Sequence, residues 1–527
     1  MGNYINPGNT AFREIRCSTY IDKSDLIYQV NKVISTKQKL LCVSRPRRFG
    51  KSYDAQMLCA YYDRNCDSSS LFCDLSIASD ADPDKKKSYL KHLNKYDVIY
   101  LDMTGVISAA PDDGIVPFIK RNIIKELQTE YPSLETAEAF HDTLANAARL
   151  SENRFIMIID EWDAPVRELP EQQNSYLMFL RSLFKNSSIT DNTFAAVYMT
   201  GILPIKKDGS ESAVSDFNEY TILDPGFFAD YTGFTENDVK KICSENGIDF
   251  QKAKTWYDGY KLDNGTSIYN PYSIMNAALR KKFRSYWRKT SASEALLTYI
   301  DMDEEGLQGD IIKLMSGETL EVDTEGFEND TRSFKNKDDV LTLMIHLGYL
   351  TCVEDENGIR YVKIPNKEVE EEFTRVLRRG KHHELLRLIA LSDQLLDDTI
   401  NCREDQVAAA IKAVHDTNFA PTIYNEEQSL RYVIKMAYIS STDQYLSISE
   451  LPSGHGYADL VFLPKRNSPL PALIIELKWN KSAESALDQI RDRNYPAVLK
   501  NYGGKLLLVG INYDAKTKAH TCKIEEL

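Results

Sequence analysis

The chain has 527 residues, 43% of them hydrophobic and 27% charged, and its formal net charge is −14 at pH 7. This length predicts about two to four domains, because single cores stop growing near 250–300 residues. The net charge argues against a protein that coats nucleic acid without specificity, since binding a polyanion depends on Lys and Arg. No apolar run approaches the roughly 20 residues needed to cross a bilayer.

The N-terminal residues Met1–Asn6 contain no basic stretch followed by an apolar one, so no signal peptide is expected. The nine cysteines are scattered, and their spacing is not that of metal ligands, which disfavours a zinc site. Scattered cysteines are typical of a reducing compartment. We therefore expect a soluble, cytoplasmic protein that does not contact a membrane.

Between Lys39 and Thr200, continuous apolar runs alternate with helix-compatible segments. The runs are residues 40–43, 98–101, 155–159 and 194–199. Continuous runs of this length are typical of strands that are buried on both faces. The first 200 residues therefore predict a parallel sheet covered by helices on both sides.

The middle of the chain predicts a mainly helical region from about Gly233 to a turn at residues 287–291. Residues 338–350 then predict an amphipathic helix, and a strand at 361–364 follows a Glu356-Asn357-Gly358 turn. This helix-plus-hairpin pattern resembles a winged helix, although other small α/β insertions share it. Further helices are expected at 368–395 and 404–415.

After Asn425 the pattern changes again. It predicts a helix at 426–438, strands at 445–449, 457–463 and 472–479, a helix at 482–493 and a last strand at 505–509. This α-β-β-β-α-β order within about 100 residues predicts a domain that folds by itself.

A candidate phosphate-binding loop follows the first apolar run. In Gly50-Lys51-Ser52 the backbone N–H groups would meet an anion at a helix N-terminus, the lysine would reach the terminal phosphates, and the serine hydroxyl would bind Mg²⁺. The spacing template calls for glycine at position 45, where this chain has Arg45. The loop alone therefore leaves the assignment open.

A second element supports a nucleotide site. Asp160 and Glu161 end the third apolar run, which places two carboxylates at the tip of a buried strand. Asp160 is expected to hold Mg²⁺ through water, and Glu161 to orient or deprotonate the attacking water. A strand end with solvated acids is the alternative. Arg47 and Arg48 are candidates for contacts with phosphate or with a neighbouring subunit of a homo-oligomer, and equally for a solvated turn.

The C-terminal segment holds a candidate cleavage site. Glu476 and Lys478 share one face of a strand, because successive residues point to opposite faces, and Asp459 lies on the preceding strand. Two acids that share Mg²⁺, with a lysine beside the attacking water, suit phosphodiester cleavage. Glu450 and Glu427 are further candidate acids, a solvated turn and a helix-start acid being the alternatives.

One basic and aromatic stretch, residues 280–289, has the composition that binds single-stranded nucleic acid. A basic helix face with its aromatic rings packed inward is the interpretation we favour.

Several motifs together resemble bacterial AAA-ATPase-like proteins that carry a C-terminal PD-(D/E)xK nuclease-like domain. The motifs are residues 44–52, Tyr20-Ile21-Asp22-Lys23, Asp160–Pro165, Thr200-Gly201-Ile202, Trp256–Tyr260, Tyr269–Ser273 and Ile364–Glu368. The resemblance covers nearly the whole chain. It implies that an arginine at position 45 is normal, and that the protein is similar to signal-transduction P-loop ATPases, which act as switches.

The same resemblance implies roles for individual residues. Thr200 lies where a sensor residue would contact the γ-phosphate, with a strand-end turn as the alternative. Gln489 and Tyr495 lie on and just beyond the helix that follows the Glu-x-Lys strand, as in similar nucleases. His455 stands where relatives carry lysine, a departure that bears on substrate contact.

The fold class that follows is α/β. We expect a P-loop NTPase parallel-sheet domain at 1–232, a helical lid region at 233–300, a helical and winged-helix-like region at 301–420, and a restriction-endonuclease-like α/β domain at 421–527.

The expected function is a regulatory ATPase whose nucleotide state gates a nuclease. ATP and Mg²⁺ are the expected cofactors, with Mn²⁺ as a substitute at the nuclease site. DNA is favoured over RNA as the substrate. The alternatives are a nucleotide-dependent switch whose C-terminal domain binds nucleic acid or protein without cutting, and a signalling ATPase with no nucleic-acid role.

Overall fold

The structure is a computed structural model, and it describes residues 2–527 except 80, 111–113, 186, 206–215, 263–264, 288–306, 328–333, 335, 380–382, 419–426, 439–440, 442–443, 454–455, 465–467 and 493–503. The chain forms two compact units, one of residues 1–286 with 321–366 and one of 287–320 with 367–527. Among the described helices, none is both long and apolar enough to cross a membrane. The predicted domain boundaries at 233, 301 and 421 stay predictions.

The first unit is built on a five-stranded sheet with the order β2-β3-β4-β1-β5. Its strands are β1 (Leu40–Ser44), β2 (Val98–Asp102), β3 (Phe155–Asp160), β4 (Phe194–Gly201) and β5 (Asn218–Tyr220). Every pair of neighbours is parallel. The four strands predicted from apolar runs are confirmed, and the short β5 at the edge was not predicted.

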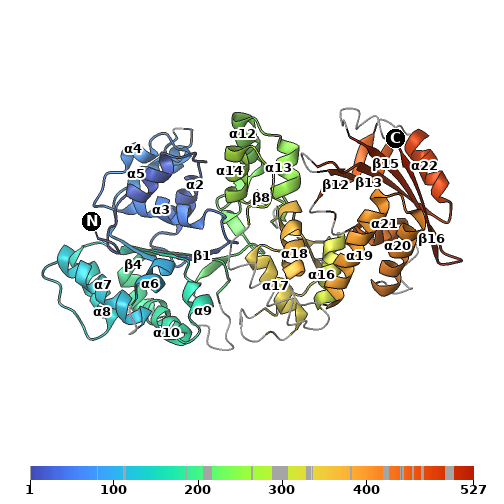
Figure 1. Cartoon of the computed structure of the whole chain (residues 1–527). Coiled ribbons are helices and arrows are strands. Elements are labelled where there is room, and N and C mark those ends of the chain that lie inside the picture. The colour runs from blue at the N-terminus through green and yellow to red at the C-terminus, as the bar shows by residue number, and fades with distance from the viewer. Residues whose placement is uncertain are drawn as a thin grey trace. The chain divides into compact units, whose positions relative to one another are not determined.

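Helices cover both faces of this sheet, as expected for strands that are apolar on both sides (Figure 1). One face carries α1 (Thr10–Arg16), α2 (Asp25–Val33), α3 (Lys51–Tyr62), α4 (Ser69–Phe72), the 3-10 turn η1 (Ser76–Ala78) and α5 (Pro83–His92). The other carries α6 (Met103–Ala109), α7 (Ile115–Glu130), α8 (Phe140–Leu150), α9 (Ala164–Glu168), α10 (Gln173–Phe184) and α11 (Ser187–Thr193).

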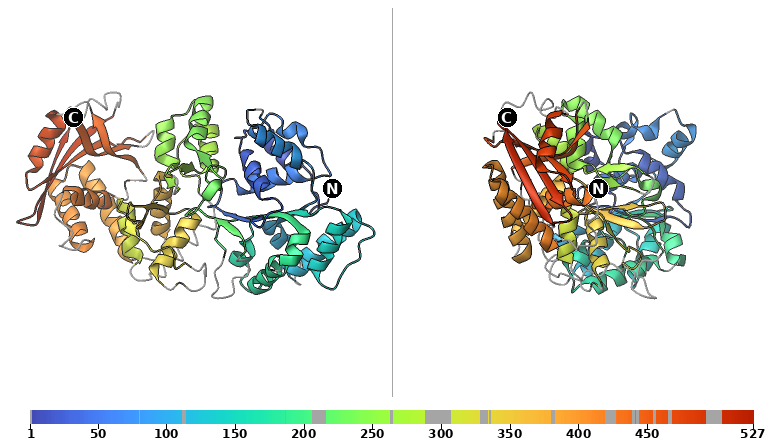
Figure 2. Two further views of the ribbon diagram at one scale, coloured as in Figure 1. Left: turned by 180° about the vertical axis from the view of Figure 1, so that it is seen from behind. Right: turned by 90° about the vertical axis from the view of Figure 1, so that its right-hand side faces the viewer.

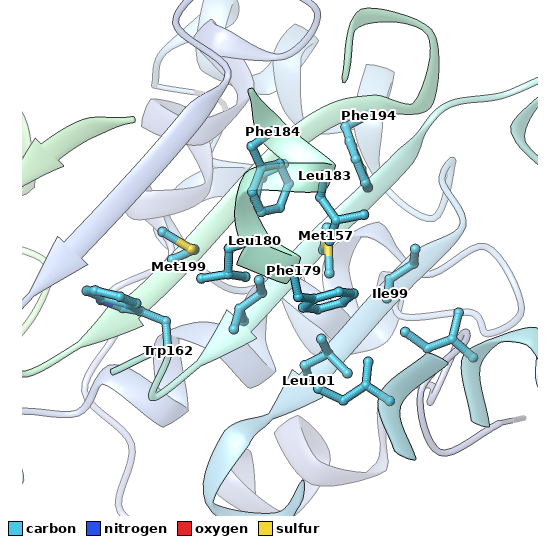
Figure 3. Packing of buried hydrophobic residues seen from close by; sticks show 14 of the residues in the cluster. Ile99, Leu101, Met157, Trp162, Phe179, Leu180, Leu183, Phe184, Phe194 and Met199 are labelled. Atoms are coloured by element: carbon cyan, nitrogen blue, oxygen red, sulfur yellow. The ribbon is translucent and has the colours of Figure 1, made fainter. Parts of the chain in front are cut away.

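The core on this second face is built of buried hydrophobic side chains. Met157 of β3 and Met199 of β4 pack against Phe179 and Leu180 of α10, and Trp162 closes the end of the cluster (Figure 3). Trp162 directly follows the Asp160-Glu161 pair and is completely buried. The strand tip that carries the candidate carboxylates is therefore fixed by core packing.

The rest of the first unit is small helices and short strands. These are η2 (Gly226–Phe228), β6 (Phe234–Thr235), α12 (Glu236–Asn246), α13 (Phe250–Tyr257), β7 (Tyr260–Lys261), β8 (Ser267–Tyr269), α14 (Pro271–Arg280), α17 (Lys337–Leu347), β10 (Thr351–Glu354) and β11 (Arg360–Lys363). Strands β6, β8 and β7 form a small antiparallel sheet that the helical interpretation of this region missed. The predicted helix-plus-hairpin is present as α17, β10 and β11.

The second unit holds α16 (Leu307–Ser316), α18 (Lys367–Arg379), α19 (His383–Ile400), α20 (Glu404–Asn418), α21 (Glu427–Ala437) and α22 (Ala483–Asp492). The chain passes from one unit to the other after residue 286, within β9 (Leu320–Glu321) and after residue 366. The single helix predicted at 368–395 is described as α18 and α19, with residues 380–382 outside the description. The predicted turn at 287–291 lies outside it beyond Trp287.

A five-stranded sheet of order β12-β13-β14-β15-β16 forms the C-terminal core of this unit. The strands are β12 (Tyr445–Ser453), β13 (Gly456–Pro464), β14 (Ala472–Trp479), β15 (Leu506–Asp514) and β16 (Ala519–Glu526). Only β14 and β15 are parallel, and α22 connects them. The same elements are seen from two further directions in Figure 2.

The last strand, β16, was missed by the sequence analysis, which placed the last strand of the domain at residues 505–509. Its inward side chains are His520, Cys522 and Ile524, which alternate with exposed residues. Because only one of the three is strongly apolar, the alternation carried a weak signal.

Candidate nucleotide and nuclease sites

The candidate phosphate loop connects β1 to α3. Gly50 has φ +97°, a conformation that a residue with a Cβ adopts only with strain, and it directly precedes the first turn of α3. The next residue, Lys51, is 5% exposed, and its Nζ donates to the carbonyl oxygens of Arg45 and Pro46, at 3.0 Å each. Burial lowers the pKa of Lys51, while the nearby carboxylates of Glu161, Asp163 and Asp160 oppose that shift.

Arg45 occupies the position where the loop template has glycine, and its side chain is buried. Its Nη1 donates to the carbonyl oxygens of Ser44 (2.9 Å) and Tyr220 (3.0 Å), and its Nη2 donates to that of Phe228 (3.4 Å). The guanidinium therefore connects the start of the loop to β5 and η2. Burial lowers the pKa of Arg45 to about 10. These hydrogen bonds are the structural explanation for an arginine at the position where the template has glycine.

A carboxylate and two hydroxyls meet beside this loop. Asp160 ends β3 and is 3% exposed. Its Oδ1 accepts a 2.5 Å hydrogen bond from Thr200 Oγ1, and the Ser52 hydroxyl also hydrogen-bonds its carboxylate. Burial raises the pKa of Asp160, and these two hydroxyls and Lys51 pull it back down.

The arrangement follows from the topology of the sheet. Strand β4 lies between β3 and β1, so the carboxyl ends of all three parallel strands meet at one edge. Ligands bind at this edge in open α/β sheets. A carboxylate next to a hydroxyl suits Mg²⁺, which prefers oxygen ligands. The described residues at this edge therefore fit a hydrated Mg²⁺ ion.

Glu161 lies one residue further, at φ +52°, and its side chain is 30% exposed. Its Oε2 accepts from Arg167 Nη2 at 3.1 Å and from Thr104 Oγ1 at 3.5 Å. Arg167 also donates from Nε to Asp163 Oδ2 at 3.0 Å. Neither Arg167 nor Thr104 was identified from the sequence, although Arg167 stands four residues after Asp163, the spacing of neighbours on a helix.

Asp163 is completely buried and fixes the segment after β4. Its Oδ2 accepts from the backbone N–H groups of Ile202 (3.2 Å) and Leu203 (3.0 Å). Gly201 lies between Thr200 and Ile202, and a Cβ at this position would come within 2.6 Å of the Trp162 ring. The motifs Asp160–Pro165 and Thr200–Ile202 thus form one packed arrangement.

A cavity of about 520 Å³ opens above the loop. Gly50, Lys51, Ser52 and Glu161 lie at its polar end. Much of the remaining wall is apolar or aromatic and comprises Tyr20, Ile21, Met57, Phe234, Tyr272, Met275 and Leu279. Thr200 is not part of this wall. Its hydroxyl goes to Asp160, and it accepts from the Glu161 N–H at 3.3 Å.

The two arginines of the loop differ in their surroundings. Arg48 (φ +71°) lies on the cavity wall, stacks 4.2 Å from the Tyr272 ring centroid, and donates from Nη1 to the Tyr286 carbonyl at 2.8 Å. Arg47 is half-buried. The contacts of Arg48 with Tyr272 and Tyr286 connect the loop to α14 and to the segment that follows α14. The phosphate roles predicted for both arginines stay predictions.

Asp54 is a buried acid that the sequence analysis missed. It follows Lys51 by three residues on α3, lines the cavity, and its Oδ2 accepts from Thr232 Oγ1 at 2.8 Å. Burial raises the pKa of Asp54 to about 7, against the opposing effect of this hydrogen bond. On a helix surface an aspartate is ordinarily solvated, so nothing in the sequence marked it.

Two of the other family motifs meet each other. Gly259 (φ +109°) packs so closely that a Cβ would lie 2.0 Å from the carbonyl oxygen of Pro365. Asn366 Nδ2 donates to the Asp258 carbonyl at 2.8 Å. Asp258 and Gly259 of the first motif therefore contact Asn366 and Pro365 of the second, and all four residues belong to the first unit.

The predicted acids and lysine of the C-terminal domain also come together. Asp459 and Glu476 lie one step beyond the strand pair Leu460–Ile475 of β13 and β14. Lys478 Nζ donates to Glu476 Oε1 at 3.0 Å and to Gln489 Oε1 at 2.6 Å, and Gln489 Nε2 donates to Glu476 Oε1. Of the predicted residues, Asp459, Glu476, Lys478 and Gln489 thus form one cluster.

The electrostatics of this cluster suit a cation. Burial, followed by the charge of Asp459, raises the pKa of Glu476 to about 7. Glu476 Oε2 is buried and has no hydrogen-bond partner among the described residues. A carboxylate oxygen of this kind suits a hard divalent ion. No group of three or more His, Cys, Asp or Glu side chains that could hold a metal is found in the described part of the chain, so other ligands would be water, backbone or substrate.

Asp459 is held by two donors. Its Oδ2 accepts from the Leu477 N–H at 2.9 Å, and its Oδ1 accepts from Arg431 Nη2 of α21 at 2.7 Å. Arg431 was not identified from the sequence. His455 and Tyr495 lie outside the described residues, as do the side chains of Glu427 and Glu450.

The basic and aromatic stretch at 280–289 is described as far as Trp287. Tyr286 and Trp287 are buried, at 7% and 5% exposure, and Phe283 packs on the α12–α14 core. Two of the three rings are buried and Phe283 is half-buried, which supports the inward-packed interpretation over a stacking platform.

Two family models match separate parts of the chain, one with each candidate site. A family model described as "Predicted AAA-ATPase" matches residues 7–210, and one described as "PD-(D/E)XK nuclease superfamily" matches residues 425–522. An uncharacterized protein in the vnfD 5′ region of Azotobacter chroococcum mcd 1 is 22% identical over 494 residues, covering 90% of each chain.

Among solved structures, the Walker-type ATPase paby2304 of Pyrococcus abyssi is 13% identical, with a TM-score of 0.33, and the match covers 67% of this chain and 94% of that one. The ORC1 protein of Aeropyrum pernix, solved in complex with DNA, is 11% identical, with a TM-score of 0.27 and coverage of 71% and 98%. The chain thus combines an AAA-ATPase-like domain at residues 7–210 with a PD-(D/E)XK nuclease superfamily domain at residues 425–522.

Proposed function

We propose that the N-terminal domain binds and hydrolyses ATP in the cavity above residues 50–52. The observation that carries this proposal is that Lys51, Ser52 and Glu161 line a cavity of about 520 Å³, while the Ser52 hydroxyl also hydrogen-bonds the Asp160 carboxylate. The aromatic and apolar residues of the same wall suit a purine ring, which is flat and apolar on its faces. A nucleotide placed this way spans the cavity.

Each polar residue has a distinct task in this proposal. Lys51 exchanges the carbonyl oxygens of Arg45 and Pro46 for phosphate oxygens, and the loop N–H groups bind the same phosphates. Ser52 and Asp160 would hold Mg²⁺, and the ion would supply positive charge against that of the phosphates. Glu161 orients the attacking water. Thr200 keeps the Asp160 carboxylate in place through the 2.5 Å hydrogen bond.

We further propose that the C-terminal domain cuts nucleic acid, with DNA as the favoured substrate. Asp459 and the buried Oε2 of Glu476 would hold Mg²⁺ or Mn²⁺, and such an ion would supply polarisation of the scissile phosphate. Lys478, fixed between Glu476 and Gln489, lies beside the attacking water. The complete set of side chains supports a cutting domain over one that only binds.

Coupling of the two activities, with the nucleotide state gating cleavage, is the proposed regulation. The test is to incubate the full chain with labelled single- and double-stranded DNA and RNA, with and without ATP and Mg²⁺. Cleavage that requires ATP and is lost in both Lys51→Ala and Glu476→Ala supports the complete proposal. Cleavage unchanged in Lys51→Ala contradicts the gating. ATP-dependent binding without any cleavage replaces the nuclease with a switch.

A further inference from the structure

Arg431 lies at the candidate nuclease site, and none of the roles considered so far uses it. It belongs to α21, which packs against β14. Its Nη2 is 2.7 Å from Asp459 Oδ1, and its side chain is 26% exposed, compared with 10% for that of Asp459. The guanidinium therefore covers one oxygen of a candidate metal ligand and is itself reachable from solvent.

Both carboxylates of the site already have a cation. Lys478 pairs with Glu476 at 3.0 Å, and Arg431 pairs with Asp459. The second oxygen of Asp459 accepts from the Leu477 N–H, which is fixed in the strand. The solvent-reachable guanidinium of Arg431 lies on Oδ1, so a metal ion that binds Asp459 through Oδ1 meets Arg431 at the same oxygen.

The charges show what happens to the arginine. Two carboxylates, Arg431 and Lys478 sum to zero, so a divalent cation leaves the site with a charge of +2. A phosphodiester and a hydroxide, at −1 each, restore neutrality. An arginine displaced from Asp459 by a metal ion is a cation next to the place where the phosphodiester arrives, and its fork of N–H donors suits phosphate oxygens.

We propose that Arg431 is an exchanging counterion: it pairs with Asp459 in the metal-free site and moves to a substrate phosphate oxygen when metal binds. The inference rests on the nuclease function proposed above and adds a residue to it. Arg431 consequently competes with the metal ion for Asp459 but strengthens the binding of the substrate. Loss of its charge should change the two affinities in opposite directions, which a residue with a merely structural role would not do.

The experiment uses the full chain with Arg431→Gln, and with Arg431→Met as a second variant that keeps the volume of the side chain. Mn²⁺ binding is titrated by calorimetry, and binding of a labelled DNA oligonucleotide is measured by anisotropy in Ca²⁺. Both variants should bind Mn²⁺ at least about fivefold more tightly than wild type, because a nearby like charge is gone. Both should bind DNA at least about fivefold more weakly.

Two controls isolate the charge of Arg431. Arg431→Lys keeps the charge and should stay within about twofold of wild type for Mn²⁺. Arg491→Gln removes an arginine of α22 that pairs with Asp488 and Glu525, and it should change neither affinity. Thermal unfolding of each variant verifies that the domain is folded.

The outcomes separate this inference from the nuclease proposal. Mn²⁺ binding that is unchanged or weaker in Arg431→Gln and Arg431→Met overturns the competition, and unchanged DNA binding overturns the transfer to phosphate. Tightening by Arg431→Lys as large as that by Arg431→Gln also overturns it, because charge is then not the cause. If wild type and Glu476→Ala take up Mn²⁺ equally, the nuclease site itself fails, and this inference fails with it.

Discussion

Arg167 joins two carboxylates of unequal exposure, Glu161 at the cavity and Asp163 in the core. Its Nη2 lies 3.1 Å from Glu161 Oε2, and its Nε lies 3.0 Å from Asp163 Oδ2. Burial opposes the charge on Arg167, but Asp163, Glu161 and Glu168 together raise its pKa. The residue that would orient water and the segment that follows β4 are therefore held by one guanidinium.

We expect Arg167→Met to destabilise the first unit by about 3 kcal/mol, because it leaves Asp163 buried without its cation. Thermal unfolding monitored by calorimetry measures this change. Glu168→Gln is the matched control: Glu168 is 45% exposed and pairs with the same arginine, so its loss should cost less than about 0.5 kcal/mol. Equal stability of Arg167→Met and wild type would contradict the structural role of the pair.

The two ends of the ATP site should respond differently to substitution. Lys51→Ala removes a fixed positive charge from the phosphate cradle and is expected to weaken ATP binding by about 100-fold or more. Glu161→Gln should bind ATP within about threefold of wild type but lose hydrolysis, because its carboxylate acts on water. Calorimetric titration and a phosphate-release assay separate the two effects. Wild-type turnover in Glu161→Gln would rule out the proposed role of that residue.

The pKa of Asp54 predicts an unusual pH dependence of stability. The folded-state pKa is raised to about 7 from the ordinary 3.8, so the folded chain keeps a proton that the unfolded chain loses. The stabilisation is complete below pH 3.8 and is lost as the pH rises through 7. This group alone makes the free energy of unfolding fall by about 1 kcal/mol per pH unit within that window.

Asp54→Asn should remove this slope, since an amide does not titrate, and should leave the protein more stable than wild type at pH 8. Thermal unfolding between pH 5 and 8 measures it. Thr232→Val keeps the carboxyl group but removes its hydrogen-bond donor, so it should lower stability and preserve the slope. An unchanged pH profile in Asp54→Asn would show that this carboxyl titrates normally.

Substitutions of the two candidate nuclease residues of β14 should also have different effects on metal binding and cleavage. Glu476→Ala removes the buried Oε2, which has no hydrogen-bond partner among the described residues, and is expected to weaken Mn²⁺ binding by at least about tenfold. Lys478→Ala should leave Mn²⁺ binding within about threefold of wild type and abolish cleavage. Calorimetry beside a cleavage assay tests the pair. Loss of metal binding in Lys478→Ala would place the lysine in the metal site and not beside the water.

The sequence predicted what continuous or spaced patterns encode. Apolar runs predicted β1 to β4. Because parallel strands end at one edge of the sheet, Asp160 and Thr200 lie there at the ends of β3 and β4, and Lys51 follows the loop after β1. The Glu-x-Lys spacing predicted a shared face, which the bond between Glu476 and Lys478 confirms. These signals are local, so one chain segment is enough to read them.

Partners from distant segments could not be predicted in this way. Arg431 reaches Asp459 across 28 positions, and Thr232 reaches Asp54 across 178. An arginine or an aspartate on a helix is ordinarily a solvated residue, and only tertiary packing buries it or aims it at another charge. The contact of β16 with α20 was missed for the same reason.

That contact leads to a prediction about the extent of the C-terminal domain. Glu404 of α20 accepts from the Ile524 N–H at 2.9 Å and from Lys523 Nζ at 2.9 Å, and His415 lies 3.2 Å from His520. The apolar face of α20 is buried at Val407, Ile411 and Val414. A fragment that begins at 421, the predicted boundary, lacks this helix and exposes the face of β16 that contains His520, Cys522 and Ile524.

We therefore expect a 367–527 fragment to unfold cooperatively, and a 421–527 fragment to melt at least about 10 °C lower or to show no transition, because buried apolar area is lost with α20. A 404–527 fragment restores α20 alone and should recover part of the difference. Scanning calorimetry of the three fragments at one concentration compares them. If 421–527 melts at the same temperature as 367–527, α20 contributes nothing to the core, and the domain ends where the sequence pattern placed it.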